Sequence, residues 1–276
     1  MKNVTYLMTA ISAAVKAGQA ILEVYRSDFD VEQKSDNSPL TLADRKSNDI
    51  ILDCLSKTQI PILSEEGRET PYDQRKTWEC LWIVDPLDGT KEFIKRNDEF
   101  TVNIALVEYG QPTLGVIFVP VKNVLYFAAQ DFGAFKLEDP PLDRIIDLQS
   151  AEDSGLLDEL ASASTRLPLP QDNTRPLTIV GSRSHAGPEL EDFVEQKRQE
   201  HGQIEFMSAG SSLKICLVAE GAADLYPRMG PTCEWDTAAG QAIAEVAGAK
   251  LLDLKTGEPL RYNRADLLNP WFIVRR

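Results

Sequence analysis

LWIVDPLDGT, residues 81–90, joins a run of four apolar residues to two aspartates that stand three positions apart. The apolar run predicts a buried strand, and Asp85-Pro86 predicts that the strand ends in a turn. Asp85 and Asp88 would flank the backbone carbonyl of Leu87 on that turn, which brings three oxygen donors close together. Mg²⁺ prefers such hard oxygen ligands and leaves its other positions to water and substrate phosphate. Asp-Pro and Asp-Gly are also ordinary turn residues, so this stretch alone leaves a metal site and a simple turn open.

Apolar segments continue downstream of this turn. They are short and are separated by Gly, Pro and Asn, which favours strands joined by tight connections. The segments lie at residues 100–107, 113–119, 124–128 and 134–137. The sequence therefore predicts an antiparallel meander that follows the strand at 81–84.

Helical periodicity surrounds the meander on both sides. Apolar residues recur at steps of three and four between residues 7 and 25, which predicts an opening helix with one apolar stripe. A second helix is predicted at residues 43–55, with Asp44 in its first turn. The second half of the chain is predicted to contain one strand and three helices, at residues 177–180, 190–199, 213–220 and 238–247. The last of these helices follows Asp236, so its N-terminus should point towards that side chain.

The order of these elements predicts the fold class and a division into two parts. Strand groups interleaved with helices indicate an α+β layered architecture. Residues 139–172 are richer in Asp, Pro and Ser and have weak periodicity, which predicts a connection with one short helix. We therefore expect an N-terminal α+β subdomain at 1–145 that carries the metal-binding turn, and a C-terminal α/β subdomain at 146–276 that completes the active site.

The charge balance limits the kinds of partner. The chain has 43 acidic and 29 basic residues, which gives a formal net charge of -14. Nucleic-acid affinity comes mainly from clustered Lys and Arg, so we exclude a nucleic-acid partner. A small anionic substrate is still compatible with this charge where metal ions or local cations invert the field at one site.

Cysteine usage and hydropathy indicate the compartment. The four cysteines form no close pair of the zinc or redox type, which favours a reducing cytoplasm. The apolar stretch at 7–22 is interrupted by Lys16 and has helical spacing, so a signal peptide fits it poorly. No segment approaches the roughly 20 apolar residues that span a bilayer. We expect a cytoplasmic protein with no integral membrane segment, and we leave open peripheral association with the cytoplasmic face of the inner membrane.

Three further carboxylates lie beside predicted structural elements. Glu65 and Glu66 follow the apolar segment 60–63, Asp44 lies near a helix start, and Asp236 precedes an Ala-rich helix. A Glu-Glu pair is often a solvated surface, and an Asp before a helix is often an N-cap. None of these carboxylates identifies a site by itself.

Taken together, these motifs resemble the lithium-sensitive, magnesium-dependent phosphomonoesterases of the inositol monophosphatase superfamily. The family pattern has an Asp, then Glu-Glu, then Asp-Pro-x-Asp-Gly-Thr, then Trp-Asp-x-Ala-Ala-Gly, and every part occurs here in order between Asp44 and Gly240. The sequence is still more similar to the 3'(2'),5'-bisphosphate nucleotidase branch. The motifs that carry this likeness are Ser38-Pro-Leu-Thr-Leu-Ala-Asp44, Leu87-Asp-Gly-Thr-Lys-Glu-Phe93, Gly181-Ser-Arg-Ser-His185, Gly210-Ser-Ser-Leu-Lys214 and Leu225-Tyr-Pro-Arg228. The resemblance implies a layered α/β/α/β/α sandwich and a monomer or homodimer.

The resemblance also implies a metal site with two or three Mg²⁺ ions. Glu65, Asp85 and the carbonyl of Leu87 would hold the first ion. Asp85, Asp88 and Asp236 would hold the second, so that Asp85 bridges the two ions. A third and weaker ion would be shared by Glu65 and water.

The catalytic residues implied by the resemblance are Asp44, Thr90 and Glu65. Thr90, with its hydroxyl tied to Asp44, would position the water that attacks phosphorus. A water held near Asp236 would protonate the leaving oxygen.

A pocket for the substrate is implied as well. Lys214 and Arg228, helped by His185, would recognise the phosphate that is not cleaved. The complete set of implied substrate-binding residues is Asp88, Gly89, Thr90, Ser182, His185, Ser211, Lys214, Arg228 and Asp236.

The implied reaction is hydrolysis of adenosine 3',5'-bisphosphate to AMP and phosphate, in the recycling of sulfur-assimilation nucleotides. Hydrolysis of 3'-phosphoadenylyl sulfate is left open as a second activity. Two alternatives use the same motifs. The first is an inositol monophosphatase or another sugar phosphatase, because one fold can serve several substrates. The second is a catalytically silent binding protein with the same fold.

Overall fold

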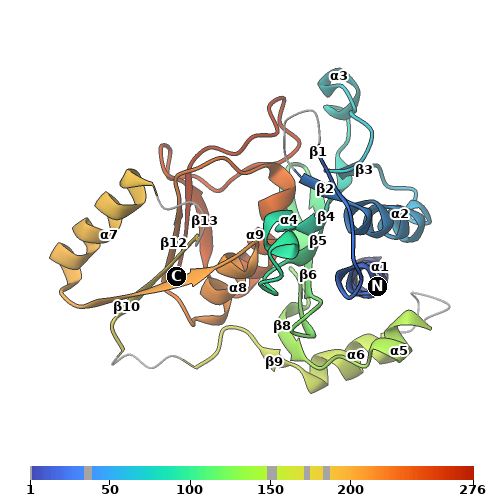
Figure 1. The fold of residues 1–276 in the computed structure, drawn as a ribbon, viewed down its shortest axis with the longest axis horizontal. Coiled ribbons are helices and arrows are strands. Elements are labelled where there is room, and N and C mark those ends of the chain that lie inside the picture. Colours follow the sequence, from blue (N-terminus) through green and yellow to red (C-terminus); the bar gives the residue numbers. More distant parts are fainter. Residues whose placement is uncertain (1, 34–38, 148–153, 171–174, 183–186) are drawn as a thin grey trace.

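Two large β-sheets with helices on their faces form the layers of the described part of the chain (Figure 1). The computed structural model describes residues 2–33, 39–147, 154–170, 175–182 and 187–276. The first sheet has seven strands in the order β3-β4-β5-β6-β7-β8-β9. Their bounds are β3 (Ile62–Ser64), β4 (Cys80–Asp88), β5 (Thr101–Glu108), β6 (Gln111–Val119), β7 (Val124–Ala129), β8 (Gly133–Glu138) and β9 (Thr165–Arg166). Strands β4 to β9 pair antiparallel and β3 pairs parallel with β4, which confirms the predicted meander.

Both faces of the first sheet are buried. Trp82 and Val84 of β4 pack into a core with α1 (Lys2–Tyr25) and α2 (Leu42–Ser56). Leu81 and Ile83 face the opposite way, into a core with α8 (Leu213–Glu220) and α9 (Glu234–Val246). Successive side chains of a strand point to opposite faces, so a strand covered on both sides is apolar without interruption. This explains the continuous apolar run before Asp85.

Helix α9 lies unusually close to the first sheet. A Cβ atom at Gly115 of β6 would stand 2.3 Å from the backbone oxygen of Ala239. Any side chain at this position would push the helix away. The glycine and the Ala-rich face of α9 therefore bring the N-terminus of this helix, with Asp236, up to the sheet.

The second sheet has five strands in the order β11-β10-β12-β14-β13. Their bounds are β10 (Leu177–Ser182), β11 (Ile204–Ala209), β12 (Leu225–Arg228), β13 (Lys250–Asp253) and β14 (Phe272–Arg275). Val180 packs into the same core as α8 and α9, so these helices lie between the two sheets. The neighbouring Gly181 faces the other way, towards Leu190 of α7 (Pro188–His201). The layers are thus α/β/α/β/α, which confirms the predicted fold class.

The connection between the sheets contains more structure than the sequence indicated. The single predicted helix is corrected to two, α5 (Leu142–Ile146) and α6 (Ser154–Ala163). Leu157 and Leu160 of α6 join the core beneath α1, which holds this segment against the first sheet. Both helices are short, and short helices depend on tertiary contacts for their stability. The division between residues 145 and 146 stays a prediction.

The remaining described elements are short. They are β1 (Val31–Gln33) and β2 (Pro39–Thr41), which pair antiparallel, with α3 (Tyr72–Arg75) and α4 (Thr90–Ile94). Helix α4 begins directly after the aspartate-rich end of β4.

Helix α1 qualifies as a membrane span by length and composition, over Val4–Tyr25. This corrects the expectation that no segment approaches the required length. Most of the helix is buried inside the protein, and Leu7, Ile11 and Val15 are fully buried in the core. Packing against the first sheet accounts for its apolar composition.

Candidate active site

The end of β4 differs from the predicted turn. The strand continues through Asp85-Pro-Leu-Asp88, with a register shift because Asp85 pairs with Asn103 while Asp88 pairs with Thr101. Pro86 has no N–H to donate to the ladder, so a bulge at this point costs little pairing. The N–H of Leu87 donates to Asp85 Oδ1 at 3.0 Å. The bulge therefore turns both carboxylates to one side, as the predicted turn would have done.

Gly89 joins this strand to α4 with a φ of 96°, in the left-handed region that favours glycine. A Cβ atom there would also stand 3.3 Å from the Cβ of Ser211. A larger residue would be strained and would crowd the loop that carries Ser211. Gly89 thus holds the two walls of the site close together.

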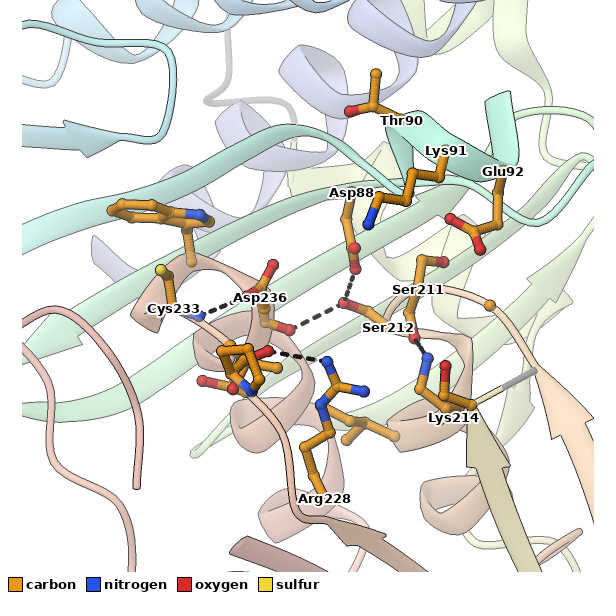
Figure 2. A pocket seen from close by; sticks show the side chains of 18 of the residues that line it. Asp88, Thr90, Lys91, Glu92, Ser211, Ser212, Lys214, Arg228, Cys233 and Asp236 are labelled. Atoms are coloured by element: carbon orange, nitrogen blue, oxygen red, sulfur yellow. Dashed lines mark hydrogen bonds between the residues drawn. The ribbon is translucent and has the colours of Figure 1, made fainter. Parts of the chain in front are cut away.

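Three carboxylates form a cluster at this point. Asp85, Asp88 and Asp236 each offer an oxygen, and these oxygens lie within 4.8 Å of one another. Asp236 comes from the first turn of α9, where its Oδ2 accepts a hydrogen bond of 2.6 Å from the N–H of Cys233 (Figure 2). Glu65 follows β3, and its N–H donates to the carbonyl of Val84 at 3.1 Å, so it lies beside β4.

The cluster is electrostatically unfavourable by itself. Burial, followed by the charges of Glu65 and Asp88, raises the pKa of Asp85 well above its ordinary value. Burial and the charge of Asp88 raise the pKa of Asp236 to about 8. Carboxylates that repel one another in a buried place require a cation to stay charged at neutral pH.

The donors of the cluster fit a hard divalent cation. Asp85 is 1% exposed, and its Oδ2 has no hydrogen-bond partner among the described residues. Buried polar atoms are normally paired, so an unpaired carboxylate oxygen facing other carboxylates indicates a missing positive ligand. Oxygen-only donors suit Mg²⁺ better than softer metals.

Asp44 and Thr90 meet beside the cluster. The hydroxyl of Thr90 lies 3.1 Å from Asp44 Oδ1 and 3.4 Å from the carbonyl of Leu87, and it donates best to the nearer carboxylate. Asp44 Oδ2 accepts from the N–H of Thr41 at 2.7 Å and from its hydroxyl at 2.6 Å, as part of the capping box of α2. Two segments far apart in the sequence are thereby joined by one buried carboxylate.

Two residues that the sequence analysis did not assign support Asp88. Ser212 Oγ lies 2.5 Å from Asp88 Oδ2 and 3.0 Å from the backbone oxygen of Asp236. Asn103 donates to Asp88 Oδ2 at 3.2 Å and to Ser212 Oγ at 2.8 Å. Asn103 could have been found as a polar residue within an apolar strand. Ser212 lies within the motif Gly210-Ser-Ser-Leu-Lys214, but its partners are distant in sequence, so the motif alone does not reveal its contact with Asp88.

A cavity of about 430 Å³ opens in front of the cluster. Figure 2 shows Asp88 and Asp236 on one side of it and Lys214 and Arg228 on the other. The predicted site residues that line the cavity are Glu65, Asp88, Gly89, Thr90, Ser182, Ser211, Lys214, Arg228 and Asp236. Asp44, Asp85 and Leu87 are buried and lie next to these lining residues. His185 lies outside the described residues.

Lys214 and Arg228 form a cationic wall of the cavity, and hydrogen bonds to backbone carbonyls hold both side chains in place. Lys214 is 5% exposed, and its ammonium donates to the carbonyl of Ser211 at 2.6 Å. Burial lowers the pKa of Lys214 to about 8, which still leaves the amine mostly charged at neutral pH. Arg228 donates from Nη2 to the carbonyl of Pro231 at 2.8 Å. Arg228 Nε and Ser211 Oγ are buried and have no hydrogen-bond partner among the described residues.

The layered sandwich is a fold that is also seen in solved structures of other proteins. The solved structure of Thermotoga maritima IMPase shares the fold, with a TM-score of 0.70 at 21% identity over 100% of this chain and 92% of that chain. The sequence profile of the inositol monophosphatase family matches residues 2–273, and the chain belongs to this family.

Relatives at higher identity come from one branch of the family. The chain is 46% identical to the 3'(2'),5'-bisphosphate nucleotidase CysQ of Escherichia coli (strain K12), over 95% of this chain and 96% of the relative. The crystal structure of CysQ from Bacteroides thetaiotaomicron has a TM-score of 0.86 and 52% identity, and the match covers 98% of this chain and 96% of that one. This confirms the resemblance that the motifs indicated.

Proposed function

We propose that this chain is a magnesium-dependent phosphomonoesterase that hydrolyses adenosine 3',5'-bisphosphate to AMP and phosphate. The observation that carries the proposal is a cavity lined both by the carboxylates of Asp88 and Asp236 and by the cations of Lys214 and Arg228. A substrate with two phosphates uses both walls, because one phosphate meets the metal ions while the other meets Lys214 and Arg228. The name of the E. coli relative, a 3'(2'),5'-bisphosphate nucleotidase, supports the same substrate.

The carboxylates would hold two or three Mg²⁺ ions. Glu65, Asp85 and the carbonyl of Leu87 are the ligands that we propose for one ion. Asp85, Asp88 and Asp236 are those for a second. When bound, Mg²⁺ neutralises the charge of the reacting phosphate and of the leaving oxygen.

The chain itself orients the attacking water in this proposal. Thr90 directs its hydroxyl proton to Asp44, so the lone pairs of its oxygen are available to accept a hydrogen bond from a water. That contact fixes the water on the side of the cavity where the metal ligands lie. The proton released by the water can pass by way of Thr90 Oγ to Asp44, and Glu65 supplies a second acceptor. A water held near Asp236 would protonate the leaving oxygen.

The setting proposed for this reaction is the cytoplasm. Cys54, Cys80, Cys216 and Cys233 are all free thiols, which is typical of a reducing compartment. Action on 3'-phosphoadenylyl sulfate and assembly as a monomer or homodimer stay predictions.

Lys214→Met tests the assignment of the two walls. Methionine keeps the apolar stem but removes the charge that would bind the uncleaved phosphate. Charge-assisted hydrogen bonds contribute about 1.5 to 3 kcal/mol, so kcat/KM for adenosine 3',5'-bisphosphate should fall about tenfold to a hundredfold. The value for adenosine 3'-monophosphate, which lacks the second phosphate, should not change.

Steady-state phosphate release with both substrates gives the answer. Lys250→Met, at the exposed first residue of β13, serves as a control that should leave both values unchanged. An equal fall of kcat/KM for both substrates would show that Lys214 supports the fold or the chemistry. It would contradict the proposal that Lys214 binds the second phosphate.

A further inference from the structure

Four of the seven tyrosines are buried, and one of them differs from the others. Tyr25 donates to Asp98 at 2.8 Å, Tyr126 donates to Glu220, and Tyr262 donates to Gln241 at 2.7 Å. Tyr226 is 4% exposed, and no hydrogen bond joins its hydroxyl to another described residue. A buried tyrosine hydroxyl usually finds a partner, since leaving it unpaired is unfavourable.

Tyr226 lines the cavity of the candidate active site. Its ring packs edge-on against Phe272, with ring centroids 5.8 Å apart and an interplanar angle of 88°. Strand pairing with Val274 holds the backbone. The hydroxyl is therefore presented by a side chain that the core keeps in one place, which is how specific binding groups are built.

The neighbours of Tyr226 belong to the cationic wall. The ammonium of Lys214 lies 5.5 Å from the centroid of its ring. Arg228 stands two positions further along β12, on the same face of the strand. Arg228 Nε and Ser211 Oγ are buried and have no hydrogen-bond partner among the described residues.

Ser211, Lys214, Tyr226 and Arg228, which line this part of the cavity, share one chemical property. Lys and Arg side chains only donate hydrogen bonds, and Ser and Tyr hydroxyls can each donate one. Burial raises the pKa of Tyr226 above its ordinary value, so its phenol keeps the proton that it would donate. A set of donors that line one part of a cavity suits a ligand group that is rich in acceptors and anionic, which describes a phosphate.

We propose that the Tyr226 hydroxyl donates a hydrogen bond to the uncleaved phosphate of the substrate and thereby helps to select bisphosphates over monophosphates. The inference rests on the proposed function and adds a neutral donor to the two cations. A neutral donor has a distinct use here, since it adds a contact to the phosphate without placing a third positive charge beside Lys214 and Arg228.

Tyr226→Phe tests the proposal because it removes the hydroxyl and keeps the ring. We expect kcat/KM for adenosine 3',5'-bisphosphate to fall about tenfold to a hundredfold, with no change for adenosine 3'-monophosphate. AMP retains the second phosphate, so its inhibition constant should rise by a similar factor. The inhibition constant of adenosine should stay the same.

Tyr126→Phe is the matched control, since Tyr126 is equally buried and its hydroxyl already has a partner in Glu220. This control should lower the melting temperature, because Glu220 loses a donor, without changing the ratio of the two kcat/KM values. Tyr226→Phe should not lower the melting temperature, because no internal hydrogen bond is lost. Tyr126→Phe should thus lower the stability alone, and Tyr226→Phe should lower the preference for the bisphosphate alone.

The outcomes separate this inference from the proposed function. A wild-type enzyme that shows no preference for the bisphosphate contradicts the proposed function, and with it the role of Tyr226. The role of Tyr226 alone is overturned if Tyr226→Phe keeps the wild-type preference for the bisphosphate. It is also overturned if the variant loses kcat/KM equally for both substrates, or if its affinity for adenosine falls as much as its affinity for AMP.

Discussion

Asp85→Asn is expected to lower kcat/KM for adenosine 3',5'-bisphosphate a thousandfold or more, at saturating Mg²⁺. The substitution keeps the side-chain volume and removes the one carboxylate that we place between two ions. Loss of a bridging ligand removes several kcal/mol of transition-state stabilisation. Phosphate release measured over a range of Mg²⁺ concentrations gives the effect, with Asp53→Asn, an exposed carboxylate on α2, as the control. Near-normal turnover of Asp85→Asn would contradict the metal assignment.

Asp85→Asn should make the folded protein more stable when metal is absent, although it lowers the activity. The pKa of Asp85 is raised in the folded state, so the folded protein binds more protons than the unfolded chain between the two pKa values. Its stability therefore falls as the pH rises through that interval, and asparagine avoids this loss. In EDTA, thermal unfolding should occur at a higher temperature for Asp85→Asn than for the wild type, with a difference that grows with pH. A lower melting temperature in EDTA would mean that Asp85 is structural.

Thr90→Val is expected to lower kcat about a hundredfold or more, with little effect on KM. Valine keeps the branched shape of threonine and removes the hydroxyl that donates to Asp44 at 3.1 Å. The water would lose the group that fixes its position, while the proposed metal ligands remain. Single-turnover measurements with excess enzyme would separate this loss from an effect on product release.

Thr90→Ser provides the matched comparison, because serine retains the hydroxyl in the first turn of α4. It should keep kcat within a few-fold of the wild type, since the contact with Asp44 can still form. A near-normal kcat in Thr90→Val would show that the hydroxyl does not position the water.

Much of this site could be predicted because its parts are local in the sequence. Asp85 and Asp88 follow a continuous apolar run, and that run is continuous because helices bury β4 on both faces. Asp44 and Asp236 each occupy the third position of a helix with a capping box, where a carboxylate has a local reason to occur. The order of the motifs along the chain then indicated that these carboxylates belong to one site.

The remaining features depend on contacts that no local pattern records. Strand β12 contains Pro227, and proline disfavours strand assignment from sequence. Strand β14 lies at the C-terminal end of the chain and pairs on both sides, with β12 and β13, so its four residues become a strand only in the assembled sheet. The missing partner of the Tyr226 hydroxyl is likewise a property of the folded cavity.

The central claim is tested most directly by phosphate release from adenosine 3',5'-bisphosphate and from inositol 1-phosphate, each measured with Mg²⁺ and with EDTA. We predict release from the bisphosphate that requires Mg²⁺, with a kcat/KM well above that for inositol 1-phosphate. A higher kcat/KM for inositol 1-phosphate would identify a sugar phosphatase instead. Absence of Mg²⁺-dependent release from both substrates would contradict the proposed activity and favour a binding protein with the same fold.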